Sequence, residues 1–143
     1  MTDLKRVSDS FYLSEQISRE DIKAAEALGV KRIICNRPDD EDAGQPSAET
    51  VAAWAEEAGM GFSHFPMDSS GPSAPLIEAT IQAVLSGEKI LAYCRTGTRS
   101  SILWSLANAK LNTMPTEEIL AAGEGAGYNL SHLAQVLEQV RSN

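Results

Sequence analysis

Short, continuous apolar stretches alternate along the chain with longer stretches in which apolar residues recur every three or four positions. The short stretches are typical of strands and the periodic ones of helices. The predicted strands are 10–13, 30–35, 61–65 and 89–93. The predicted helices are 18–29, 47–59, 75–85, 100–110, 116–122 and 131–141. This alternation predicts an α/β fold with a mainly parallel central sheet and helices on both faces.

Polar residues mark several of the predicted helix starts. Ser18 precedes Asp21 by three residues, which is the spacing of a capping box. We also expect Thr116 to cap the helix that it opens. Trp54 and Trp104 fall on the apolar stripes of their helices, so both are expected in the core.

Composition narrows the classes of function. The 143 residues, 43% of them hydrophobic, fit one compact domain spanning 1–143. A formal charge of −8 argues against nucleic acid and anionic membranes as partners, but leaves room for a small anionic substrate held by local positive charge. The polar start and the absence of a long apolar run favour the cytoplasm. The scattered cysteines and histidines show no metal-ligand spacing, so we expect no metal or other cofactor.

The candidate chemistry lies in segment 94–100, between the last predicted strand and a helix. A cysteine at a strand end is commonly a small buried hydrophobe. Here, however, Cys94 is followed by a glycine turn at Gly97 and by Arg99, whose planar fork suits an oxyanion. The turn and the helix start provide N–H donors for an anion. The same field favours the reactive thiolate. The neighbours expected to bind substrate are Arg95, Thr96, Gly97 and Thr98.

Three further residues are assigned from their position. Ser100 follows the arginine and is expected to stabilise the thiolate or to help it leave. Arg37 follows a predicted strand, where it could reach the substrate anion or tie down the acidic segment 39–42. Cys35 is expected to be a core residue rather than a resolving thiol.

The loop resembles the signature of cysteine-based tyrosine and dual-specificity phosphatases. The chain as a whole is similar to the bacterial beta-lactamase hydrolase-like phosphatase domain family. The segments that carry this similarity are 36–41, 44–47, 92–100 and 126–130. The resemblance implies a dual-specificity-phosphatase-like fold and hydrolysis of a phosphate monoester through a thiophosphate at Cys94. It also implies that Asp68, in the loop after the third strand, is the general acid.

Two departures from the phosphatase pattern keep other functions open. Four residues separate Cys94 from Arg99, where phosphatases have five, and Tyr93 stands where they have histidine. The shorter loop is similar to that of single-domain rhodaneses, which carry a sulfane sulfur on the cysteine. The alternatives are therefore a sulfurtransferase with a persulfide on Cys94, and a non-catalytic module that binds an anion or a protein.

Overall fold

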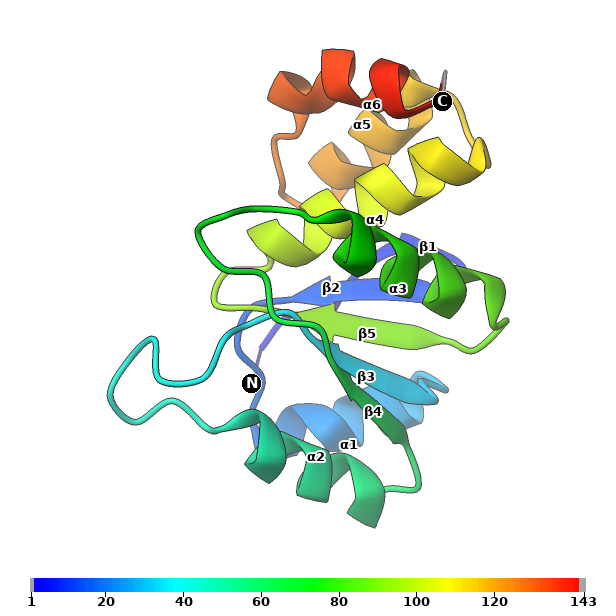
Figure 1. Ribbon diagram of the computed structural model, residues 1–143. Coiled ribbons are helices and arrows are strands. Elements are labelled where there is room, and N and C mark those ends of the chain that lie inside the picture. Colours follow the sequence, from blue (N-terminus) through cyan, green and yellow to red (C-terminus); the bar gives the residue numbers. More distant parts are fainter. Residues whose placement is uncertain (1, 142–143) are drawn as a thin grey trace.

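The computed structural model describes residues 2–141, and these residues build a five-stranded sheet covered by helices (Figure 1). The strands follow the spatial order β1 (Lys5–Ser8), β2 (Phe11–Ser14), β5 (Ile90–Tyr93), β3 (Arg32–Cys35) and β4 (Gly61–His64). All neighbouring pairs are parallel except β1 and β2. The predicted α/β class and the mainly parallel sheet are confirmed. The edge strand β1 was not predicted, because its sequence KRVS has no run of apolar residues.

Helices cover both faces of this sheet (Figure 1). One face carries α1 (Arg19–Ala27) and α2 (Ala48–Glu57). The other face carries α3 (Ala74–Leu85), α4 (Thr98–Leu111), α5 (Thr116–Gly125), the 3-10 turn η1 (Ser131–Leu133) and α6 (Ala134–Arg141). Figure 1 shows α5 and α6 stacked beyond α4, and α5 also contacts the edge strand β1. Each face has its own apolar core.

The helix starts follow local side-chain chemistry. Ser18 and Asp21 form the predicted capping box at α1. The prediction for Thr116 is wrong, because Pro115 is the N-cap of α5 and Thr116 is its first helical residue. Proline suits that place, since its backbone conformation is extended and no donor is lost. The predicted helix 131–141 divides into η1 and α6, because Leu133 bonds back to the carbonyl of Leu130 in a tighter turn.

The two tryptophans differ from each other in burial. Trp104 on α4 is 1% exposed and lies in the core, as expected. Trp54 on α2 is only partly buried and packs against the rim of the α1–α2 core, which corrects the prediction. An apolar stripe predicts which side of a helix faces inward, but it does not predict how far a neighbouring helix covers a large ring at the edge of that stripe.

Helix α4 runs through the centre of its layer and is buried on most sides. It contacts α3, α5 and α6 as well as the sheet. The buried polar side chains bond within the helix: Ser105 donates to the carbonyl of Ser101 at 2.7 Å, and Asn108 to that of Trp104 at 2.9 Å. These bonds allow polar residues in the interior without unpaired groups. The helix that follows the cysteine is therefore fixed by packing all round.

None of the helices in residues 2–141 combines the length and the apolar character needed to cross a membrane.

Candidate functional site

Parallel pairing places Cys94 at the carboxyl edge of the sheet. The register sets Tyr93 of β5 opposite Ser14 of β2 and Cys35 of β3, so these three strands end at the same level. Cys94 follows at once, and its neighbour on the β3 side is Asn36, whose N–H donates to the carbonyl of Tyr93 at 2.8 Å. Ligand sites of open α/β sheets lie at this edge.

The cysteine loop turns sharply into α4 at Gly97. This residue is the N-cap of α4 and has a φ of +95°, a conformation that glycine adopts without strain. Its N–H donates to Cys94 Sγ at 3.1 Å. Cys94 is a free thiol with an exposed fraction of 0%. The sulfur is thus buried inside the loop, where it accepts the Gly97 N–H close to the N-terminus of α4, as the sequence predicts.

Arg99, in the first turn of α4, already holds an oxyanion from the protein itself. Its Nη1 and Nη2 donate to the two carboxylate oxygens of Glu41, each at 2.8 Å. Nη1 also donates to the carbonyl of Met67 at 3.0 Å. Hydrogen bonding to Arg99 lowers the pKa of Glu41 to about 2, and hydrogen bonding to Glu41 raises the pKa of Arg99. This bidentate pairing is the geometry that a guanidinium uses for phosphate as well as carboxylate.

Arg37 ties down the acidic segment from a buried position. Its side chain is 4% exposed and donates to Gln16 Oε1 at 2.9 Å, to Glu41 Oε1 at 3.0 Å and to Asp42 Oδ2 at 2.7 Å. Arg95 is largely exposed, and its Nε lies 3.2 Å from the same Asp42 carboxylate. Of the two places considered for Arg37, the structure shows the one that anchors this segment.

Ser100 uses its hydroxyl as a donor to Asn36. The hydroxyl donates to Asn36 Oδ1 at 2.8 Å, and both residues are buried. The amide of Asn36 in turn donates to the carbonyl of Phe65 at 3.0 Å, at the end of β4. Asn36 therefore links β3, the exit of β4 and α4. The single hydroxyl proton of Ser100 is engaged in this link, whereas the Gly97 N–H donates to Cys94 Sγ.

Asp68 lies in the expected loop but faces solvent. Its carboxylate accepts hydrogen bonds from the N–H and the hydroxyl of Ser70. The hydroxyl bond is the main cause that lowers the pKa of Asp68. The loop itself does reach the site, because the carbonyl of the preceding Met67 accepts the bond from Arg99. The backbone is thus beside the arginine while the Asp68 carboxylate is turned toward Ser70.

The threonines of the loop form its outer rim. Thr96 Oγ1 bonds to Thr98 Oγ1 at 3.1 Å and accepts from the N–H of Thr98 at 3.3 Å. The carbonyl of Thr96 accepts from the Tyr128 hydroxyl at 3.2 Å. The sequence analysis gave no role to Asn36 or Tyr128, and it placed Glu41 only within the acidic segment that Arg37 could tie down. For Asn36 the available signal was a polar residue directly after a buried strand. No spacing in the sequence indicated that Glu41 or Tyr128 contacts the cysteine loop.

Cys35 lies in the core on the α1–α2 face, together with Tyr93, as predicted. Its thiol is free and donates to the carbonyl of Arg37 at 3.3 Å. Burial is the main cause that raises the pKa of Cys35, which keeps it in the less reactive thiol form.

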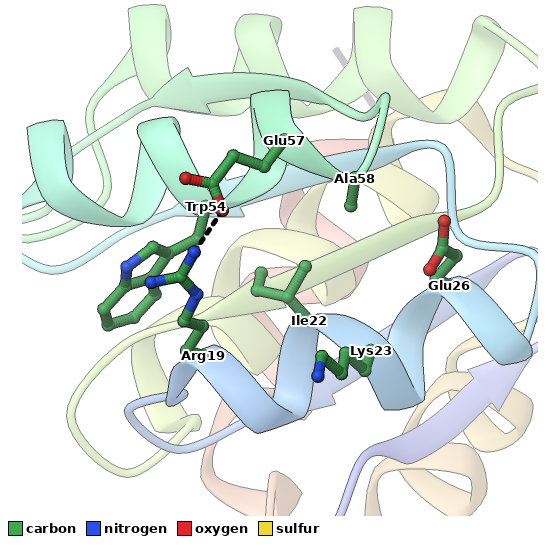
Figure 2. Close-up of a pocket in the computed structure, with 7 residues that line it drawn as sticks. All are labelled: Arg19, Ile22, Lys23, Glu26, Trp54, Glu57 and Ala58. Atoms are coloured by element: carbon green, nitrogen blue, oxygen red, sulfur yellow. Dashed lines mark hydrogen bonds and ion pairs between the residues drawn. The ribbon is translucent and has the colours of Figure 1, made fainter.

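A groove of about 440 Å³ lies between α1 and α2, lined by none of the cysteine-loop residues. Figure 2 shows Arg19 reaching across it to the carboxylate of Glu57, beside the ring of Trp54, with Ile22 on its floor. The charged side chains at its rim are the ones expected on solvated helix faces. The Cys94 loop, rather than this groove, therefore carries the candidate chemistry.

Known proteins share both the sequence pattern and the fold of this chain. The family model of the beta-lactamase hydrolase-like protein, phosphatase-like domain, matches residues 3–111. A beta-lactamase hydrolase-like protein of Xylella fastidiosa strain 9a5c is 26% identical over 134 residues, which are 93% of this chain and 31% of that protein. The chain thus spans about a third of the length of the curated relatives it matches.

Solved structures agree with the fold. A candidate phosphatase of Neisseria meningitidis Z2491 is 35% identical, with a TM-score of 0.83 and coverage of 96% of this chain and 98% of that one. A Cys-to-Ser variant of P. aeruginosa TpbA in complex with phosphotyrosine is 15% identical, with a TM-score of 0.64 and coverage of 98% and 90%. At that identity the likeness concerns the fold alone. Together with the family model, these matches show that the chain belongs to the family of phosphatase-like domains of beta-lactamase hydrolase-like proteins.

Proposed function

We propose that this protein is a cysteine-dependent phosphatase-like hydrolase that cleaves a phosphate monoester through Cys94. The observation that carries the proposal is the bidentate contact between Arg99 and Glu41, in which both terminal nitrogens of Arg99 donate to carboxylate oxygens at 2.8 Å. The thiol of Cys94, which accepts the Gly97 N–H, belongs to the same loop. A nucleophile, an N–H donor and a bidentate cation at one place are the elements of covalent catalysis at a charged centre. The family and the phosphatase fold support the same reaction.

In this reaction the Cys94 thiolate attacks phosphorus and forms an S–P bond while the bond to the ester oxygen breaks. Arg99 and the loop N–H groups bind the non-bridging oxygens as charge moves onto them. Water then attacks the phosphocysteine and releases inorganic phosphate and the thiolate. Asp68 is the proposed general acid for the leaving oxygen. An ionised Asp68 bonded to Ser70 has no proton to give, so this role requires the carboxylate to leave Ser70 and to be protonated next to the bound substrate.

The substrate must displace part of the structure to react. Cys94 has no exposed surface, and Arg99 is occupied by Glu41. A phosphate dianion that enters the loop competes with Glu41 for the same two N–H groups. Glu41 therefore acts as an internal competitor for the proposed substrate.

The test is hydrolysis of an aryl phosphate by the wild-type protein and by Cys94→Ser, with sulfate binding measured by calorimetry on both. We expect the variant to lose turnover and to keep anion binding within about 3-fold. Full activity of Cys94→Ser would rule out the proposal. Asp68→Asn should slow the hydrolysis of esters with poor leaving groups more than that of esters with good ones. If the substitution slows both by the same factor, Asp68 is not the general acid.

A second function is favoured by one specific feature, the four-residue spacing between Cys94 and Arg99. In sulfur transfer the Cys94 thiolate attacks the outer sulfur of thiosulfate, the S–S bond breaks, sulfite leaves and a persulfide stays on Cys94. No general acid is needed for this step, which agrees with an Asp68 that bonds to Ser70. Intact mass after incubation with thiosulfate separates the two functions. Gain of one sulfur atom by the wild type and not by Cys94→Ser would put sulfur transfer first.

A further inference from the structure

Tyr128 contacts the cysteine loop from outside. It lies in the connection after α5, beyond residues 3–111 that the family model covers. Its side chain is buried, with 8% of the residue exposed, and its hydroxyl donates to the carbonyl of Thr96 at 3.2 Å.

The Thr96 carbonyl and the Gly97 N–H belong to one peptide unit. The described residues contain no cis peptide bond, and in a trans peptide the oxygen and the hydrogen point in opposite directions. The hydrogen of this unit is directed at Cys94 Sγ, with N and S 3.1 Å apart. The Tyr128 hydroxyl and the Cys94 sulfur thus hold the two opposite ends of the same peptide plane.

An outside anchor is needed because the loop itself resists rotation of this plane weakly. Gly97 has no Cβ and tolerates a wide range of φ, so its own conformation does not prevent a peptide flip. A flip would replace the N–H at the sulfur by the Thr96 carbonyl oxygen. A negatively charged thiolate is stabilised by the first arrangement and destabilised by the second.

The position of Tyr128 is fixed by its own contacts, and its hydroxyl stays protonated, so that it can donate a hydrogen bond. Its N–H bonds to the carbonyl of Gly123 at 2.8 Å, and the Lys5 ammonium lies 5.1 Å from the centre of its ring. Burial raises the pKa of Tyr128 to about 12, so the hydroxyl keeps its proton throughout the neutral range. The contact also explains the glycine, because a Cβ at Gly97 would lie 1.9 Å from Tyr128 Oη.

We propose that Tyr128 is a positioning residue that holds the Thr96–Gly97 peptide with its N–H toward Cys94 and thereby sets the reactivity of the thiolate. The proposal rests on the proposed function only in taking Cys94 as a reactive nucleophile. It holds for phosphoryl and for sulfur transfer alike.

The experiment is the pH dependence of Cys94 alkylation by iodoacetamide, followed by peptide mass so that Cys35 is counted separately. Tyr128→Phe keeps the ring and removes only the donor. We expect it to slow alkylation at pH 6 about 3- to 10-fold and to move the midpoint of the pH profile upward, as loss of a hydrogen bond that favours the thiolate would. Lys5→Met is the matched control: it removes the cation over the ring, keeps the hydroxyl and should leave the midpoint unchanged.

A purely structural role gives a different result. Loosening of the loop would change the alkylation rate by the same factor at every pH and leave the midpoint in place, and that outcome would overturn the proposal. If Tyr128→Phe fails to fold, the wild type still provides a test by NMR. The Gly97 amide resonance should titrate with the alkylation midpoint, and a resonance that does not respond would contradict the proposal. Because iodoacetamide is a substrate of neither proposed reaction, a failed phosphatase or sulfur assay leaves this test intact.

Discussion

The cysteine loop has two flanks of opposite character. On one flank, the acidic segment places Glu41 and Asp42 against arginines, with carboxylate side chains 29% and 50% exposed. On the other, the neutral donors and acceptors of Asn36 and Tyr128 are 2% and 8% exposed. Both flanks are held by hydrogen bonds of similar length, from 2.7 to 3.2 Å.

The difference lies in what replaces these bonds when they break. Water or a substrate anion can take the place of the carboxylate on Arg99 or on Arg95, so these two partly exposed ion pairs contribute little net stability. A buried hydroxyl or amide that loses its partner stays unpaired and carries the full cost of desolvation. The acidic flank is therefore suited to being displaced, and the neutral flank to holding the loop in shape.

The largest effect is expected at Asn36. Asn36→Leu leaves the Ser100 hydroxyl and the Phe65 carbonyl without their buried partner, so it should lower the free energy of unfolding by about 4 kcal/mol. Ser100→Ala removes one of the two bonds and should cost about 1–2 kcal/mol. Urea denaturation measures both. A loss below that of Ser100→Ala would show that Asn36 does not link the strands energetically.

Next comes Gly97, with Gly44 of the acidic flank as its matched control. Both have positive φ, +95° and +80°, but a Cβ at Gly97 would collide with Tyr128 while one at Gly44 meets nothing within 4 Å. Gly97→Ala should destabilise by about 3 kcal/mol and Gly44→Ala by about 1 kcal/mol. Equal losses in thermal or urea unfolding would mean that Tyr128 yields to the new methyl group.

On the acidic flank, Glu41→Gln should change both ligand binding and stability. Removal of the internal competitor should tighten sulfate binding about 2- to 5-fold. The free energy of unfolding should fall by about 1 kcal/mol, because the buried Arg37 loses one of its two charged partners and keeps Asp42. Calorimetric titration with sulfate measures the affinity, and urea denaturation measures the stability. Weaker binding in the variant would show that Glu41 helps to hold the anion instead of competing with it.

The pKa of Glu41 determines how the effect of Glu41→Gln on sulfate affinity depends on pH. The pKa of Glu41 is lowered from 4.5 to about 2 by its contact with Arg99, so the carboxylate is fully charged above pH 4.5 and is protonated only as the pH falls through 2. The gain in sulfate affinity should therefore be constant between pH 5.5 and 8. A gain that disappears within that window would assign the competition to another group.

The smallest effect is expected for Asp42→Asn. Asp42 pairs with the buried Arg37 at 2.7 Å and with the exposed Arg95 at 3.2 Å. We expect a change in sulfate affinity of less than about 2-fold, because Glu41, and not Asp42, occupies the two terminal nitrogens of Arg99 and the exposed pair with Arg95 is screened. A change as large as that of Glu41→Gln would show that the two acidic residues act as one unit.

The sequence was informative where the deciding interactions are local. Ser18 and Asp21 lie three residues apart and formed the predicted capping box. The placement of Cys94 at the carboxyl edge followed from strand alternation alone. The strand β1 was missed because a polar edge strand is stabilised by pairing with β2, a partner that no pattern in its own residues indicates.

The candidate site was only partly predictable for the same reason. The direction of the Ser100 hydroxyl depends on Asn36, which is 64 positions away in the sequence. The conformation of the Arg99 side chain depends on Glu41, which is 58 positions away. Asp68 was placed in the right loop, yet the direction of its carboxylate is set by a short turn with Ser70. Contacts between distant segments, and the choice of one rotamer among several, arise only once the fold brings the partners together.

The all-round burial of α4 has a consequence for how fast the site can respond. A helix packed against α3, α5, α6 and the sheet moves only if the core on its face of the sheet rearranges, and such rearrangements are slow motions that involve partial unfolding. The acidic segment is an exposed loop, and loops of that kind rearrange in nanoseconds to microseconds. The backbone of Arg99 is therefore fixed, while the loop that carries its partner Glu41 moves quickly. We expect the exchange of one anion for another on Arg99 to be limited by diffusion and not by slow rearrangement of the domain.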